Sequence, residues 1–400
     1  MRIRPIAILT MILVATLSGQ MPGKQIVRPP AGSNPPYNLA ITAGGTIYVA
    51  GQLPTNAEGQ LVGTDIASQA EQVFANLKGV LAQANSSLEQ AVSVTVMLEN
   101  GSDFAALDPV YAKQFGSVPP ARTTYIGDMV RAGALLEISV IAVPNGVDRK
   151  AVLPEGWLKP TSPYSYGIHA GDTLYISGLV SRNGRDNTMV AGDVPAQTKT
   201  IMDNLGAILG AAGMSYQDVV QGRVTLEDMT HFQAMNEVYR SVWEKDRPAR
   251  VSFQASPPGT YDVEIAFLAI KGTDTREVIV PLRADGTPGP IGPNFSPAIK
   301  VGNRLFVSGG TGVTDDNHGD MKAQTTETLT RLGRSLTAAG YSFADVVESS
   351  VYVKGVDGFS TMSETYRTIF PTDPPVRATV GVDRLANEAA LVEIMVTAVK

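Results

Sequence analysis

Three apolar stretches, each interrupted by one glutamate, decide the fold: LLEISVIAV at 135–143, DVEIAFLAI at 262–270 and LVEIMVTAV at 391–399. Their glutamates, Glu137, Glu264 and Glu393, recur at a near-constant interval along the chain. A pattern that returns in this way is the mark of a repeated structural unit. The sequence therefore predicts three tandem copies of one module.

Two further signals recur in the same order in each copy. The first is an apolar run that ends in glycine: TIYVAG at 46–51, TLYISG at 173–178 and RLFVSG at 304–309. The second is a proline-containing turn that ends in arginine: PPAR at 119–122, RPAR at 247–250 and PPVR at 374–377. Polar linkers near 145–150 and 271–276 separate the copies. The expected bounds are 24–146 for module 1, 147–273 for module 2 and 274–400 for module 3.

The spacing of apolar residues changes along each module. Alternating runs predict strands, whereas apolar residues three or four positions apart predict a helix. The first helix of module 1 is indicated by Ile66, Ala70, Val73, Leu77 and Leu81. A second helix is indicated in each module by Phe104, Leu107 and Tyr111, by Phe232, Met235 and Tyr239, and by Phe359, Met362 and Tyr366. The order is β-β-α-β-α-β-β, an α+β module with both helices on one face of its sheet.

The final strand of each module is apolar on both faces, as in residues 265–268. Strands of this kind are buried on two sides. Helices cover one face, and another copy of the module is the simplest cover for the other. We expect the three copies to close into an intrachain pseudo-trimer. The alternative is three independent domains joined like beads.

Composition excludes several kinds of site. The chain has 400 residues, a net charge of -6 and no clustered lysine or arginine, which argues against nucleic acid as a partner. It has no cysteine, so disulfides and thiolate chemistry are excluded. Its three histidines, His169, His231 and His318, lack the spacing of metal ligands, so no metal is expected.

The N-terminus has the order of a secretory signal. Arg2 and Arg4 precede an apolar run at 6–17, which small residues follow. This run is shorter than the about 20 residues that a membrane span needs. We therefore expect residues 1–23 to be a signal peptide, leaving no stable membrane span after processing. The mature chain would be exported, either periplasmic or secreted. The alternative is an uncleaved anchor.

A glutamate within an apolar strand is unusual because an unpartnered buried carboxylate is costly. Each follows the arginine of its module, Arg122, Arg250 or Arg377, after a short and similar interval. Two strands joined by a short turn would bring the two side chains of one module together. They could form an ion pair that fixes the register of the strands. Alternatively, the arginine could hold a ligand carboxylate while the glutamate orients or deprotonates water. Both interpretations remain open at this point.

Several of these motifs together resemble the RidA/YjgF family of reactive intermediate deaminases. The resemblance is carried by SPYS at 162–165, LYISG at 174–178, NEVY at 236–239, RPAR at 247–250 and DVEIAFLAI at 262–270. It covers nearly all of the mature chain, once per module. It implies a chorismate-mutase-like fold and trimers with sites at subunit interfaces. A pocket here could accordingly combine residues of two modules.

The resemblance also implies site residues. In module 2 it matches every position, which gives a catalytic set of Arg250, Glu264, Tyr164, Ser177 and Asn236. In the other modules it implies substrate-binding residues at Arg122, Glu137, Tyr37, Arg377, Glu393 and Ser308. Departures from the pattern are Ala50, Asp108, Phe295 and Ser363. Where some members carry a cysteine, this chain has Thr124, Ser252 and Thr379.

The implied activity is hydrolysis of enamines or imines, such as 2-iminopropanoate-like acids, to 2-oxo acids and ammonia. Arginine would bind the substrate carboxylate, glutamate would activate water, and the serine and tyrosine hydroxyls would assist. No cofactor is required, because an imine carbon is already electrophilic. The alternatives are a non-catalytic module that binds small carboxylates and a chaperone-like protein of the same family.

Overall fold

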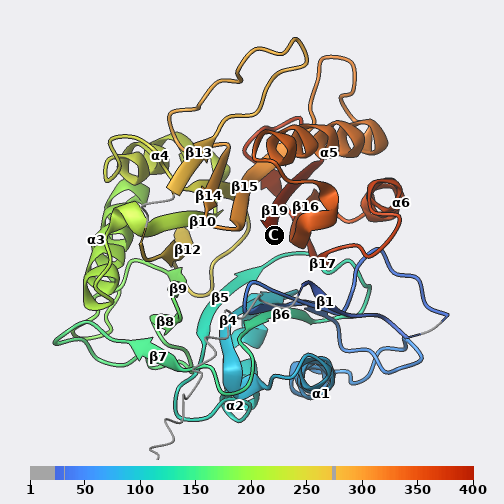
Figure 1. Ribbon diagram of the computed structural model, residues 1–400. Coiled ribbons are helices and arrows are strands. Elements are labelled where there is room, and N and C mark those ends of the chain that lie inside the picture. Colours follow the sequence, from blue (N-terminus) through green and yellow to red (C-terminus); the bar gives the residue numbers. More distant parts are fainter. Residues whose placement is uncertain (1–22, 31, 273–275) are drawn as a thin grey trace, which may run out of the picture.

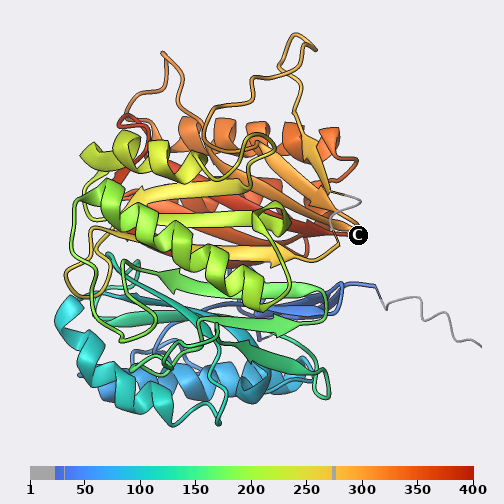
Figure 2. The same ribbon diagram turned by 90° about the vertical axis from the view of Figure 1, so that its left-hand side faces the viewer.

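The computed structural model describes residues 23–30, 32–272 and 276–400, and the predicted signal peptide lies outside them except for its last residue. Figure 1 shows three α+β modules around a common centre, with the helices outside and the sheets turned inward. In the view turned by 90°, helix α3 (Val194–Ala211) crosses the outside of the module 2 sheet (Figure 2). The predicted fold class is confirmed.

Each module has the predicted order of elements and one additional short strand at its start. Module 1 contains β1 (Gln25–Val27), β2 (Ala40–Ala43), β3 (Thr46–Gln52), α1 (Ile66–Gln83), β4 (Ala91–Leu98), α2 (Phe104–Ala112), β5 (Ala121–Ile126) and β6 (Leu136–Ala142). Module 2 contains β7 (Arg149–Val152), β8 (Gly167–Ala170), β9 (Thr173–Leu179), α3, β10 (Val219–Leu226), α4 (Phe232–Arg240), β11 (Ala249–Gln254) and β12 (Val263–Ile270). Module 3 contains β13 (Arg276–Ile279), β14 (Ala298–Val301), β15 (Arg304–Thr311), α5 (Met321–Ala338), β16 (Val346–Lys354), α6 (Phe359–Ile369), β17 (Val376–Val382), β18 (Arg384–Leu385) and β19 (Val392–Val399).

The strand order decides which side chains can meet. In module 1 it is β1-β2-β3-β6-β4-β5, and modules 2 and 3 repeat it, with β18 of module 3 added beside β11. Strand β4 pairs in parallel with β5, which carries Arg122, and antiparallel with β6, which carries Glu137. The arginine and glutamate strands of one module are therefore separated by a third strand. The expectation that the two side chains of one module lie together is wrong, because the short connection between β5 and β6 passes the end of β4.

The first helix of each module begins at an aspartate. The side chains of Asp65, Asp193 and Asp320 each accept a hydrogen bond from a backbone N–H in the first turn. Such caps satisfy donors that have no partner within the helix. The predicted apolar positions of α1 all face the sheet and are buried. None of the helices in the described ranges is both long and apolar enough to cross a membrane.

The other face of each sheet packs against a neighbouring module. Apolar clusters join module 1 to module 2 around Tyr175, module 2 to module 3 around Phe306, and module 3 to module 1 around Tyr48. A fourth cluster, which includes Phe253, combines residues of all three modules. The proline-containing turns repeat one contact around the ring: backbone N–H groups of Ser165, Ser296 and Asn38 donate to the carbonyls of Pro120, Pro248 and Pro375. The chain thus closes an intrachain pseudo-trimer.

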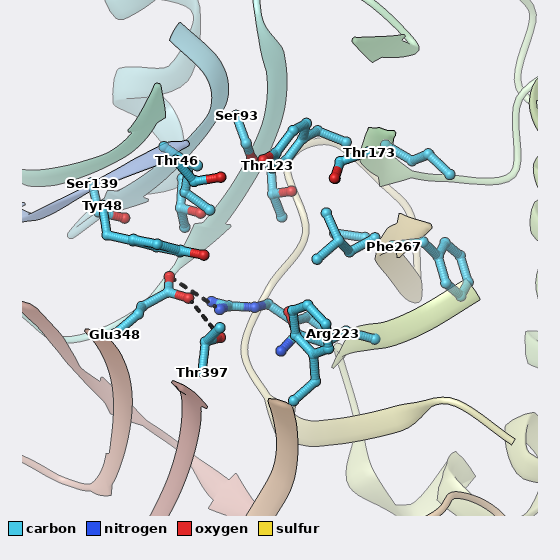
Figure 3. A pocket seen from close by; sticks show the side chains of 18 of the residues that line it. Thr46, Tyr48, Ser93, Thr123, Ser139, Thr173, Arg223, Phe267, Glu348 and Thr397 are labelled. Carbon is cyan, nitrogen blue, oxygen red and sulfur yellow. Dashed lines mark hydrogen bonds and ion pairs between the residues drawn. The ribbon is translucent and has the colours of Figure 1, made fainter. Parts of the chain in front are cut away.

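A cavity of about 70 Å³ lies where the three sheets meet (Figure 3). Arg223 Nη2 of module 2 lies 3.5 Å from Glu348 Oε1 of module 3. The Thr397 hydroxyl donates to Oε2 of the same carboxylate at 3.1 Å. A trimer of identical subunits would repeat each of these side chains three times around the axis. One chain can instead place a cation opposite an anion there. None of the repeated arginines and glutamates of the sequence motifs lines this cavity.

Candidate functional site

Each repeated arginine lies next to the glutamate of the following module. We call the three places where this occurs interface 1–2 (Arg122 with Glu264), interface 2–3 (Arg250 with Glu393) and interface 3–1 (Arg377 with Glu137). In each, the positive charge of the arginine lowers the pKa of that glutamate. At interface 1–2 the backbone N–H of Thr124 also donates to the Glu264 carboxylate at 3.4 Å. Among the described residues, none of these pairs forms a direct ion pair, so the register-fixing interpretation is not supported.

Aromatic rings enclose each guanidinium. Two rings come from the second helix of the arginine's own module, and one comes from the segment before the first long strand of the next module. At interface 2–3, the Arg250 Cζ lies 4.7 Å from the Tyr239 ring centre, 5.4 Å from Phe295 and 5.6 Å from Phe232. Rings at such distances attract a cation. The aromatic residues that indicated the second helix of each module therefore also form the walls of the site. The other interfaces repeat this cage with Phe104, Tyr111 and Tyr164, and with Phe359, Tyr366 and Tyr37.

The glycine at the end of the first apolar run makes room for the glutamate. A Cβ atom on Gly178 would lie 1.6 Å from a carboxylate oxygen of Glu264. The same conflict would arise between Gly51 and Glu137 at 1.7 Å, and between Gly309 and Glu393 at 2.2 Å. The glycines were visible in the sequence as a motif, but their role was not predicted. It follows from the pairing of the two strands that carry them.

Burial changes the acidity of all three glutamates. It raises the pKa of Glu137, Glu264 and Glu393 to about 8, and the neighbouring arginine offsets part of that increase. Burial also lowers the pKa of Arg250 to about 10, so this guanidinium stays charged at neutral pH. A carboxyl group with a pKa near 8 exists in both forms around neutrality. It can therefore take a proton from water and return it later in the same reaction.

The serine implied by the resemblance has a positioning role. Ser177 Oγ accepts a hydrogen bond from the backbone N–H of Arg122 at 2.8 Å and donates to the Ser165 carbonyl at 2.7 Å. Ser308 makes the same two bonds, to Arg250 N at 2.9 Å and to the Ser296 carbonyl at 2.6 Å. The hydroxyl thus holds the arginine strand of one module against the next. At interface 3–1, Ala50 occupies this position and cannot do so.

The structure divides the module 2 set between two interfaces. Arg250 belongs to interface 2–3 with Ser308, Glu393 and Phe295 from module 3, and Asn236 lies on α4, the helix that supplies two rings of the same cage. Tyr164, Ser177 and Glu264 belong to interface 1–2, with Arg122 and Asp108 from module 1. Tyr37, Glu137, Arg377 and Ser363 meet at interface 3–1. No interface has all five family residues, since each interface replaces at least one of them.

The interfaces differ most in what the guanidinium contacts. At interface 1–2, Arg122 Nη1 lies 2.7 Å from Asp108 Oδ1. At interface 3–1, Arg377 Nη2 donates to Ser363 Oγ at 3.1 Å. At interface 2–3, Arg250 is 1% exposed, and none of its three side-chain nitrogens has a hydrogen-bond partner among the described residues. The same holds for both amide atoms of Asn236 and for Oε2 of Glu393. A buried charge without hydrogen-bond partners is unfavourable for folding, so these groups are candidates for binding a ligand.

Cavities lie beside two of the interfaces. One of about 480 Å³ borders interface 2–3 through Phe295, Ser308 and Gly309, and Arg283, Arg331 and Arg334 also line it. One of about 370 Å³ borders interface 1–2 through Tyr164. Pockets of this size hold small ligands. Arg250, which is almost fully buried, does not line the first cavity itself, whereas Phe295 of its aromatic cage does.

Comparisons with known proteins agree with this architecture. A curated protein from Sulfurisphaera tokodaii, named RutC family protein, is 40% identical over 124 residues, which cover 31% of this chain and 99% of that protein. A mouse protein named 2-iminobutanoate/2-iminopropanoate deaminase is 38% identical over 111 residues, covering 28% of this chain and 82% of its own length. A crystal structure of a chorismatase matches with a TM-score of 0.52 over 78% of this chain and 93% of its own chain. At 18% identity, that match shows the fold alone.

The comparison that reaches all three modules is with a family profile. The profile described as Endoribonuclease L-PSP, which represents the RidA/YjgF proteins, matches residues 28–144, 156–271 and 287–400, once in each module. These three segments include every arginine and glutamate of the interfaces. The chain belongs to the RidA/YjgF family, three copies of whose domain it joins in tandem.

Proposed function

We propose that the chain hydrolyses imines and enamines of small 2-oxo acids, such as 2-iminopropanoate, and that interface 2–3 carries this reaction. The observation that supports the proposal best is the Arg250 guanidinium, which is buried, charged and without a hydrogen-bond partner among the described residues. Its planar fork matches a carboxylate. The mouse relative is named for deaminating this class of substrate, which supports the same choice.

The chemistry needs a carboxylate-binding group and a group that moves protons. Arg250 would hold the substrate carboxylate, and the Asn236 amide would supply a further hydrogen bond. Glu393 would take a proton from a water molecule as the water oxygen bonds to the imine carbon. The electron pair of the C=N double bond would move to nitrogen. After the nitrogen gains protons, the C–N bond breaks, ammonia leaves and a carbonyl remains. Glu393 suits both proton transfers because burial raises its pKa to about 8.

An ammonia-release assay tests the proposal. An amino acid oxidase would generate 2-iminopropanoate in the presence of the chain, and release above the spontaneous rate would be measured. We expect the wild-type chain to accelerate release and Glu393→Gln to reduce the acceleration at least tenfold. If the wild-type chain binds a 2-oxo acid in calorimetry without accelerating release, the non-catalytic alternative replaces this proposal.

We also propose that the chain acts outside the cytoplasm. The motivation is the order of positive, apolar and small residues at the start of the sequence. Protein recovered from its host should begin near residues 19–24 when its N-terminus is sequenced. Recovery of intact Met1 in a cytosolic fraction would contradict the proposal.

A further inference from the structure

We propose that interface 1–2 is a second site, for imines that carry no carboxylate, and that Asp108 sets this specificity. The inference rests on the proposed function, because it assigns the same hydrolytic chemistry to a different class of substrate. Three features of interface 1–2 carry it: the contact of its arginine, the state of its glutamate and the lining of its cavity.

The arginine of interface 1–2 already contacts an anionic side chain of its own module. Asp108 Oδ1 lies 2.7 Å from Arg122 Nη1, and the two side chains are 21% and 4% exposed. Asp108 occupies the helix position that Asn236 holds at interface 2–3. A ligand carboxylate would have to displace Asp108 or accept a like charge close by, and such repulsion is strong in a partly buried site. Interface 1–2 therefore selects against the ligand that suits Arg250.

The rest of interface 1–2 keeps the family residues and the glutamate that the proposed hydrolysis needs. Tyr164 and Ser177 keep the family residues at their positions, whereas interface 2–3 has Phe295 in place of the tyrosine. Glu264 Oε2 has no hydrogen-bond partner among the described residues. Its pKa is raised to about 8 by burial, as at the other two interfaces. At interface 1–2 the arginine is thus no longer free to bind a ligand carboxylate, but Glu264 is still present for proton transfer.

The cavities beside the two interfaces also differ in the charge of their lining residues. Both cavities are lined mainly by apolar groups, and they differ in charge: the cavity beside interface 1–2 has Lys159 as the one cation among its lining residues. The cavity beside interface 2–3 has three arginines among its lining residues, of which Arg331 and Arg334 pair with Glu327 at 2.8 and 4.0 Å. Apolar walls with few charges suit an uncharged aliphatic imine, whereas a larger number of cations attracts an anion.

The proposed step is balanced without a cofactor. Water adds to the imine carbon and gives a proton to Glu264, and the C=N electron pair passes to nitrogen. Protonation of that nitrogen and loss of ammonia leave an aldehyde or ketone. One water is consumed and one ammonia is released for each carbonyl formed.

Two substrates and three variants of the full mature chain test the inference. An amino acid oxidase supplies 2-iminopropanoate, and an amine oxidase acting on a primary aliphatic amine supplies an imine without a carboxylate. We expect Glu264→Gln to reduce turnover of the carboxylate-free imine at least tenfold, and Glu393→Gln to do so for 2-iminopropanoate. Adding Asp108→Asn to Glu393→Gln should restore 2-iminopropanoate turnover at least tenfold, because an amide at this position would complete the family set around Arg122.

The control for the lost charge is Asp103→Asn in the same Glu393→Gln background. Asp103 directly precedes helix α2 and does not contact Arg122, so this change should restore nothing. If Asp108→Asn also restores nothing, or if the wild-type chain accelerates only 2-iminopropanoate, the inference is overturned while the proposed function stands. If the wild-type chain accelerates neither substrate, the proposed function fails as well.

Discussion

Interfaces 1–2 and 2–3 share one backbone framework and differ in side chains around the arginine. In both, a serine hydroxyl links the arginine strand to the next module, and a buried glutamate lies against a glycine. At interface 1–2 the guanidinium contacts Asp108, whereas at interface 2–3 the neutral Asn236 occupies that helix position and the guanidinium has no hydrogen-bond partner among the described residues. The framework thus defines where a ligand binds, and one helix residue changes which charge the ligand can carry.

Fusion of the modules makes this difference possible. In a trimer of identical chains, every substitution appears at all three interfaces at once. In a single chain, Asp108, Asn236 and Ser363 occupy one helix position with three different side chains. The Arg223–Glu348 pair in the central cavity has the same origin. Divergence between the interfaces is therefore a property of the fused chain, and the following predictions test how far it extends.

The largest expected effect comes from removing both neighbours of module 2. A chain of residues 147–273 alone would expose apolar residues of two clusters, including Ile168, Tyr175, Val220 and Ile270. We expect it to trimerise or precipitate, whereas the mature full chain should remain a closed unit in light scattering. Tethering favours intrachain closure because it gives neighbouring modules an effective concentration of about millimolar. A well-behaved monomeric module 2 would contradict the closed pseudo-trimer.

The next effect distinguishes the binding roles of Arg250 and Arg122. Arg250→Ala should weaken binding of a small 2-oxo acid by about 1.5–3 kcal/mol, which is roughly 10- to 150-fold. Arg122→Ala should change that affinity little, because Asp108 already occupies its guanidinium. Calorimetry measures both affinities, and thermal melts show whether each variant is folded. A loss in Arg122→Ala with unchanged affinity in Arg250→Ala would reverse the assignment of the two interfaces.

A smaller effect concerns pH. Burial raises the pKa of Glu393 from 4.5 to about 8, so most of this carboxyl is protonated at pH 7. If it acts as the base, the ionised form is the active one. The value of kcat/KM for 2-iminopropanoate should then rise about tenfold per pH unit below 8 and level off above it. The rising limb should be missing in Glu393→Gln, and a profile that instead falls as pH rises through 8 would assign Glu393 the role of an acid.

Much of this architecture could be predicted from the sequence, because it depends on local patterns. The repeated strands, the two helices of each module and the need to cover the second sheet face follow from apolar spacing. The short edge strands β1, β7 and β13 could not be predicted, because they are brief and partly exposed. The resemblance implied pockets that combine two modules, but residue spacing did not show which glutamate is the partner of each arginine. This pairing depends on the position of β4 between β5 and β6 and on the ring of modules, and neither leaves a local signal.

The smallest expected effect tests whether the two interfaces really share one framework. Ser177 and Ser308 each accept from an arginine N–H and donate to a carbonyl, and the corresponding hydrogen-bond lengths nearly coincide. Replacing either by alanine leaves a buried N–H and a buried carbonyl without that partner, which costs about 1–3 kcal/mol. Because the two geometries match, Ser177→Ala and Ser308→Ala should lower the thermal midpoint by similar amounts, and the exposed Ser102→Ala should not lower it. Unequal losses would mean that the interfaces have diverged in their framework as well as in their ligand-facing residues. Equal losses, together with opposite substrate preferences, would confine the difference to the side chain beside the arginine.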